Sequence, residues 1–230
     1  MCGRYAITLP PEAMRRLFGY VEQPNFPPRY NVAPTQPVPI VRAGGGQRHF
    51  GLVRWGFLPG FVKDPKTFPL IINARAEGIE TKPSFRAAIR RRRCLFIADG
   101  WYEWRRTSDA RGKMVKQPFL FRAADRGPLA FAGLWETWSD PQGGEVETGC
   151  MITTSANGAT VAIHDRMPAI IEPADFDRWL DCSDDRATRV DMLKPAPEDR
   201  IEFFEVSLKV NSYKTDGPDL QAPLAQASLL

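Results

Sequence analysis

Short apolar runs, and stretches in which apolar and polar residues alternate, recur along the chain between prolines and glycines. Segments of this length bounded by turn residues are typical of β-strands. Because Gly44–Gly46 separates residues 38–42 from residues 47–55, these two segments are expected to form a hairpin. Residues 118–123 and 129–135 are likewise expected to pair. The predicted strands cover residues 3–8, 38–42, 47–55, 94–98, 102–105, 118–123, 129–135, 145–154, 169–171 and 200–209.

Helices are expected to be short and to lie outside the sheet. Pro11 opens a predicted helix that runs to Phe18 and is ended by Gly19. His164–Pro168 is expected to be a loop, and the chain is expected to be irregular from about Asp216. Further helices are predicted from the Lys82-Pro83-Ser84 segment to about Arg91, and over residues 157–163, 173–180 and 184–194.

The order of these elements lacks the strand–helix–strand alternation of a parallel α/β protein. It therefore predicts an α+β fold, a single β-rich domain spanning residues 1–230, with a mixed, barrel-like sheet and peripheral helices. The 21 prolines and 18 glycines among 230 residues agree with many turns. A hydrophobic content of 43% provides material for a real core.

Composition excludes several classes of protein. The sequence contains no apolar run of about 18 residues, so no membrane span is expected. The four cysteines show neither a CxxC spacing nor a paired framework. We therefore expect no metal site, no disulfide scaffold and no cofactor, and a reducing, cytoplasmic compartment.

The charge balance is compatible with an anionic partner but does not require one. The net charge is +4, and arginine dominates the cations. Tryptophans stand beside arginines at Arg54-Trp55 and Trp104-Arg105. Exposed aromatic rings in a basic groove would bind single-stranded nucleic acid by stacking, but the same rings are ordinary core material. The Arg90–Arg93 block is typical of a solvated helix end.

Cys2 is the first candidate for chemistry. Met1 is usually trimmed before a small residue, and its removal would leave Cys2 with a free α-amine next to its thiol. With ordinary pKa values of roughly 7.7–8.0 and about 8.5, both groups are partly reactive near neutral pH. Such an aminothiol condenses with an aldehyde to a Schiff base and then closes to a thiazolidine. On the sequence alone, a cysteine at this position is more often without function.

Asn73 and Arg75 are polar positions that follow an apolar pair. On a strand they would share one face, where the guanidinium could bind a phosphate and the amide could orient a ligand. A plain solvated strand edge would show the same pattern. His164 lies two residues before Arg166 and could donate a proton, or could simply be a surface residue.

Glu103 lies between two aromatic residues, Tyr102 and Trp104. Aromatic neighbours would exclude water from the carboxylate and raise its pKa, which suits a general acid–base. The alternative is an exposed strand carboxylate between two core rings.

Taken together, four motifs resemble the SRAP family, the SOS-response-associated peptidases or abasic-site-processing proteins. The Arg29–Thr35 and Trp55-Gly56 segments resemble the same family. One departure lies near Gly60, where a second tryptophan would be expected. The four motifs, in family order, are Met1-Cys2-Gly3-Arg4, Asn73-Ala74-Arg75-Ala76-Glu77, Asp99-Gly100-Trp101-Tyr102-Glu103-Trp104 and His164-Asp165-Arg166-Met167-Pro168.

The resemblance implies the SRAP fold and a covalent adduct with abasic sites in single-stranded DNA. Cys2 would be the nucleophile through amine and sulfur, and Asn73 would hold the amine. Glu103 would be the general acid–base, and His164 would protonate the sugar ring oxygen. The DNA contacts carried over are Arg4, Trp55, Arg75, Trp104, Arg166 and, less specifically, Thr153.

The resemblance also implies AP-lyase-type strand cleavage when the reaction stops at the Schiff base, and self-removal of Met1. The expected partner is single-stranded DNA that contains abasic sites, with no membrane partner. We expect a monomer, associated with the nucleoid when engaged on DNA. Two other functions remain open at this point: a cysteine-dependent peptidase, and a non-covalent module that binds single-stranded nucleic acid.

Overall fold

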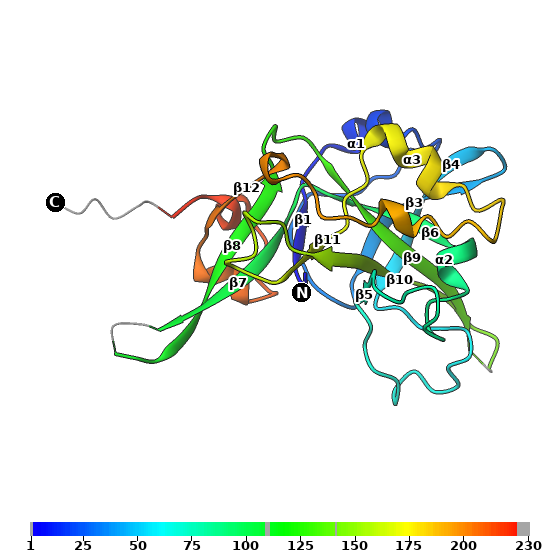
Figure 1. The fold of residues 1–230 in the computed structure, drawn as a ribbon, viewed down its shortest axis with the longest axis horizontal. Helices are drawn as coiled ribbons and strands as arrows, with labels where there is room; N and C mark the ends of the chain where they lie inside the picture. The colour runs from blue at the N-terminus through cyan, green and yellow to red at the C-terminus, as the bar shows by residue number, and fades with distance from the viewer. Residues whose placement is uncertain (1, 109–110, 141, 225–230) are drawn as a thin grey trace.

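The computed structural model describes residues 2–108, 111–140 and 142–224, which form two β-sheets with short helices around them (Figure 1). Among these residues, no helix is long and apolar enough to cross a membrane. The predicted α+β class, with a mixed barrel-like sheet and peripheral helices, is confirmed.

The larger sheet closes on itself. Its order is β11-β10-β4-β3-β6-β9, and β10 also pairs with β9, so that five strands form a closed barrel. β10 pairs in parallel with β4 and β5, and antiparallel with β9 and β11. The strands are β3 (Pro37–Gly44), β4 (Gln47–Trp55), β5 (Asn73–Arg75), β6 (Arg93–Ala98), β9 (Leu129–Ser139), β10 (Glu145–Ser155) and β11 (Arg166–Pro168).

The smaller sheet has the order β12-β8-β7-β1-β2 and is antiparallel throughout. The β7–β8 hairpin reaches out beyond the body of the molecule (Figure 1). β7 begins at Gly100. This position requires glycine, because a Cβ there would lie 2.4 Å from the carbonyl oxygen of Phe121. The strands are β1 (Tyr5–Ile7), β2 (Arg29–Val32), β7 (Gly100–Ser108), β8 (Met114–Ala123) and β12 (Ile201–Glu205).

The helices predicted over residues 11–18 and 173–180 are confirmed, and the other predicted helices are shorter or absent. Residues 157–163 form turns, in which Asn157 Oδ1 accepts hydrogen bonds from the backbone and hydroxyl of Thr160. Arg189 has a φ of 58°, which interrupts the helix predicted over residues 184–194. The helices are α1 (Pro11–Phe18), α2 (Ala88–Arg91), α3 (Phe176–Leu180) and the 3-10 turns η1 (Pro173–Asp175), η2 (Val190–Met192), η3 (Glu198–Arg200), η4 (Leu208–Asn211) and η5 (Pro218–Gln221).

Three predictions about strands are wrong. Residues 169–171 do not form a strand, since Ile170 makes only an isolated bridge to Phe131. Residues 118–123 and 129–135 do not pair with each other: β8 pairs with β7 and β12, whereas β9 pairs with β6 and β10. The connection between them carries the chain from one sheet to the other. In the predicted loop at His164–Pro168, the last three residues form β11 on the edge of β10.

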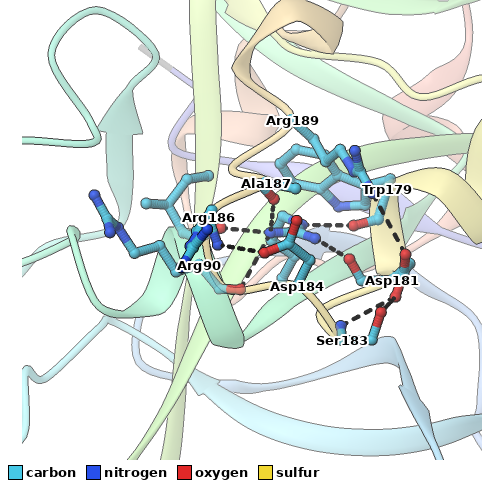
Figure 2. A network of polar contacts seen from close by, with 10 residues as sticks. Arg90, Trp179, Asp181, Ser183, Asp184, Arg186, Ala187 and Arg189 are labelled. Carbon is cyan, nitrogen blue, oxygen red and sulfur yellow. Dashed lines mark hydrogen bonds and ion pairs between the residues drawn. The ribbon is translucent and has the colours of Figure 1, made fainter.

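The arginine block does not behave as a uniformly solvated helix end, because Arg93 is only 1% exposed. Its guanidinium donates to main-chain carbonyls at the ends of α2 and α3 and in the loop that follows α3. Figure 2 shows Trp179, Asp181 and Ala187, three of the residues whose carbonyls accept these bonds. Arg93 therefore ties both helices to β6. The accepting carbonyls belong to Ile89, Arg90, Trp179, Asp181 and Ala187.

Candidate active site

Strand β1 places Cys2 beside Glu103 of β7. Tyr5 is paired with Trp101 in this antiparallel ladder, so that continuing the register puts residue 3 opposite Glu103. Cys2 is only 1% exposed. Its Sγ lies 3.7 Å from the carbonyl oxygen of Arg4 and 4.0 Å from Sδ of Met151. The thiol is therefore buried where the N-terminal segment packs against β10.

Strand β5 brings Asn73 to the same place. The parallel pairing of β5 with β10 sets Asn73 opposite Met151, the residue whose sulfur contacts Cys2. Asn73 Nδ2 donates to the carbonyl oxygen of Cys2 at 2.8 Å. Among the described residues, the buried Oδ1 of Asn73 has no hydrogen-bond donor. A buried acceptor without a donor is costly, so this oxygen suits an amine hydrogen brought in at Cys2.

Glu103 has the properties of a proton carrier. It is 2% exposed. Burial raises the pKa of its carboxyl group to about 7. Near neutral pH both protonation states are therefore populated, which is the condition for both accepting and donating protons. Burial, and then the charge of Glu103, raise the pKa of the Cys2 thiol. The thiol is thus neutral and needs a base to react.

His164 faces Glu103, with Nε2 lying 3.9 Å from Oε2 of the carboxylate. Its Nδ1 accepts the backbone N–H of Arg166 at 3.0 Å. In the tautomer that accepts this bond the neutral ring carries its proton on Nε2, the side toward Glu103, whereas Oδ1 of Asp165, 3.0 Å from Nδ1, favours a proton on Nδ1. Burial lowers the pKa of His164, which favours this neutral form. His164 is set up as a hydrogen-bond and proton donor toward the space beside Glu103.

Arg166 is engaged by protein groups. It makes a two-point ion pair with Glu77, at 2.7 and 2.8 Å, and donates to the carbonyl oxygen of Thr153 at 2.6 Å. The Thr153 side chain is buried and its hydroxyl donates to the carbonyl oxygen of Ala74. The phosphate contact of Thr153 stays a prediction. Arg166 can bind a phosphate only in competition with Glu77.

The two tryptophans predicted to stack on DNA differ in exposure. Trp55 is 0% exposed, and its Nε1 donates to the carbonyl oxygen of Ile72 at 3.0 Å. Trp55 is part of the core in this structure, and its contact with DNA stays a prediction. Trp104 is partly exposed, and its Nε1 donates to Oδ1 of Asn211 at 2.6 Å. Only Trp104 offers a ring at the surface of the site.

The two remaining residues predicted to contact DNA, Arg4 and Arg75, lie in different surroundings. Arg4 Nη1 donates to Oδ1 of Asn31 at 2.9 Å and to the carbonyl oxygen of Val210 at 3.1 Å. It thereby fixes the N-terminal strand to the C-terminal segment. Arg75 is exposed on β5. Contacts of Arg4 and Arg75 with phosphates stay predictions.

A cavity of about 370 Å³ opens beside Glu103. Sequence reasoning missed several of its residues, as well as Met151. Alternation along β7 could have indicated Arg106 as a neighbour of Trp104, but nothing in the sequence pointed to Met151 or Asn211. No group of three or more His, Cys, Asp or Glu side chains in the described part of the chain is placed to hold a metal ion. The cavity is lined by Glu103, Trp104, Arg106, Lys116, His164 and Asn211.

Comparison with known proteins identifies relatives along nearly the whole chain. The family model for SOS response associated peptidase (SRAP) matches residues 1–213. The abasic site processing protein YoqW of Bacillus subtilis is 35% identical over 224 residues, which cover 96% of this chain and 98% of that protein. The abasic site processing protein YedK of Escherichia coli is 30% identical and covers 97% of this chain and 100% of its own. A crystal structure of a Bacteroides thetaiotaomicron protein superimposes with a TM-score of 0.84 at 25% identity, over 97% of this chain and 100% of that one.

Proposed function

The chain belongs to the SRAP family, and from that premise we propose that it processes abasic sites in single-stranded DNA by forming a covalent thiazolidine at Cys2. Relatives that carry the name abasic site processing protein support the substrate. One observation supports the chemistry most strongly: Asn73 bonds the backbone of Cys2, while Glu103 lies beside it with a pKa near 7.

The reaction begins with hydrolysis of the Met1–Cys2 peptide bond, which frees the α-amine of Cys2. The ring-opened abasic sugar presents an aldehyde. The amine adds to its carbonyl carbon, and loss of water gives a Schiff base. The sulfur of Cys2 then bonds to the same carbon, while the thiol proton ends on the nitrogen. The product is a five-membered ring that contains both nitrogen and sulfur.

Each group next to Cys2 has a definite role in these reaction steps. Glu103 first donates a proton to the hydroxyl that leaves as water and takes one from the nitrogen, and it then carries the proton of the neutral Cys2 thiol to the nitrogen as the sulfur adds. The Oδ1 of Asn73 accepts a hydrogen from the amine and keeps the amine aimed at the aldehyde. The Nε2–H of His164 donates to the ring oxygen of the closed sugar, which favours ring opening.

Two side activities follow from the same site. A Schiff base that is not captured by sulfur permits β-elimination of the neighbouring phosphate, which is a lyase-type cleavage of the strand. Hydrolysis of the Met1–Cys2 bond by the protein itself would use Glu103 to activate water. General cysteine proteolysis is less favoured, because a cysteine peptidase activates its thiol with an adjacent base such as histidine, whereas the contacts of the Cys2 Sγ are the carbonyl oxygen of Arg4 and Sδ of Met151.

The test uses Met1-free protein and a single-stranded oligonucleotide with one abasic site, without reductant, on a denaturing gel. A band of lower mobility is expected from the parent protein and not from Cys2→Ala. Cys150→Ala is the matched control, since Cys150 is also fully buried but lies within β10. An equal band from Cys2→Ala, or no band from protein with a free Cys2 amine, would reject the proposal.

A further inference from the structure

Two cations stand directly opposite each other on the β7–β8 hairpin. Arg106 of β7 is the cross-strand partner of Lys116 of β8, and both are exposed. Like charges directly opposed on one face of a sheet are destabilising. Among the residues that the structure describes, neither side chain has a hydrogen-bond or ion-pair partner. The hairpin therefore carries a repulsive pair that its own fold does not relieve.

Other cations of the same two strands are neutralised. Arg105 Nη2 lies 2.8 Å from Oε1 of Glu205, and Arg122 Nε lies 2.6 Å from Oε1 of Glu202. Both carboxylates belong to β12, which pairs with β8. This contrast separates Arg106 and Lys116 from ordinary surface charges of the hairpin.

The pair lies at the mouth of the reactive site. Arg106 and Lys116 line the same cavity as Glu103 and His164. Because side chains alternate along a strand, Trp104 and Arg106 share one face of β7, about 6.8 Å apart along the strand. Trp104 is partly exposed there. A fixed aromatic ring next to unneutralised cations is the arrangement that binds single-stranded nucleic acid.

We propose that Arg106 and Lys116 together bind one phosphate of the DNA strand beside the abasic nucleotide. The proposal rests on the proposed function, because it names a contact of the same substrate. A guanidinium offers two parallel donors to phosphate oxygens, and an ammonium adds a point charge. Binding of the phosphate relieves the repulsion between the two cations. Because the contact involves the DNA backbone and no base, its contribution to binding does not depend on the DNA sequence.

The test measures binding without chemistry. The probe is a single-stranded oligonucleotide with a tetrahydrofuran residue, which has no aldehyde, in place of the abasic sugar. The double variant Arg106→Gln/Lys116→Gln is compared with Arg105→Gln/Arg122→Gln, which removes the same charge from the same two strands. The dissociation constant is measured across a series of salt concentrations.

The first double variant should bind roughly tenfold more weakly at low salt, and the slope of log K against log salt should flatten by about 0.7. The second should keep the parent slope. Equal slopes for parent and first double variant, or equal losses in both double variants, would overturn the proposal.

Thermal unfolding separates binding from folding. Removal of a repulsive pair should leave the Tm of Arg106→Gln/Lys116→Gln equal to that of the parent or higher. A lower Tm would mean that the two cations serve the fold, and would overturn the proposal. Failure of the parent to form an adduct with a true abasic site would reject the proposed function alone, since the tetrahydrofuran probe reports the phosphate contact independently.

Discussion

Nε2 of His164 lies 3.9 Å from Oε2 of Glu103, and burial shifts the pKa values of the two groups in opposite directions. The carboxyl group is raised to about 7, whereas the imidazole is lowered from its ordinary value. Both shifts favour the uncharged form. Near neutral pH the site therefore holds a neutral donor beside a carboxyl group that is close to half-protonated.

Replacing Glu103 by Gln should slow adduct formation by about 10²- to 10³-fold, because the amide can neither take nor return a proton. In the parent protein the initial rate should change with pH around 7, where Glu103 titrates. That inflection should be missing from the pH profile of Glu103→Gln. Gel-based initial rates between pH 5 and pH 9 provide the measurement, and an inflection that survives in the variant would assign it to another group.

Burial of Glu103 also predicts a pH-dependent stability. A carboxyl group with a folded pKa near 7 and an unfolded value near 4.5 binds more protons in the folded state between these values. The contribution of Glu103 to the free energy of unfolding is therefore fully present below about pH 4.5. As the pH rises through 7 this contribution is lost, which lowers the free energy of unfolding by at most about 3 kcal/mol. Glu103→Gln removes this dependence, so its gain over the parent in denaturant unfolding should be larger at pH 8 than at pH 5. An equal difference at both pH values would contradict the raised pKa.

Replacing His164 by Gln should slow reaction with a natural abasic site by about 10²-fold, because the closed sugar loses its proton donor. An oligonucleotide with an open-chain aldehyde that cannot form the cyclic sugar should react with parent and variant at similar rates. Comparison of the two substrates isolates ring opening from the later steps. A similar loss on both substrates would place His164 in Schiff-base chemistry instead.

Replacing Arg93 by Met should destabilise the protein by about 3 kcal/mol or more, because several buried carbonyl oxygens lose their donor. Arg90→Met is the matched control: the Arg90 side chain is exposed, and its change should stay within about 0.5 kcal/mol. Chemical denaturation of both variants gives the comparison. A small loss in Arg93→Met would mean that the helices are held by other contacts.

The sequence predicted what local signals determine. Proline at the start and Gly19 at the end located α1, and the glycine run located the β3–β4 hairpin. It did not predict that β8 pairs with β12 or that β9 pairs with β6, since the two strands of each pair lie far apart along the chain. The burial of Arg93 was missed because its acceptors are main-chain carbonyls, which leave no trace in residue types.

In the candidate site, too, local motifs could be predicted from the sequence and long-range contacts could not. Motif resemblance named Cys2, Asn73, Glu103 and His164, but spacing alone could not bring Asn73 to Cys2, which depends on parallel pairing of β5 with β10. The burial of Trp55 could not be predicted, because a buried and an exposed tryptophan look alike in sequence. The opposition of Arg106 and its cross-strand partner required the register of the hairpin.

The most direct measurement of the central claim counts free thiols in the adduct. The chain has four cysteines, Cys2, Cys94, Cys150 and Cys182. The purified adduct and the free protein are alkylated with iodoacetamide under denaturing conditions, and their masses are compared. A thiazolidine predicts alkyl groups on every cysteine except Cys2 in the adduct and on all of them in the free protein. Full alkylation of the adduct would show that sulfur has not bonded to the sugar and would contradict the account.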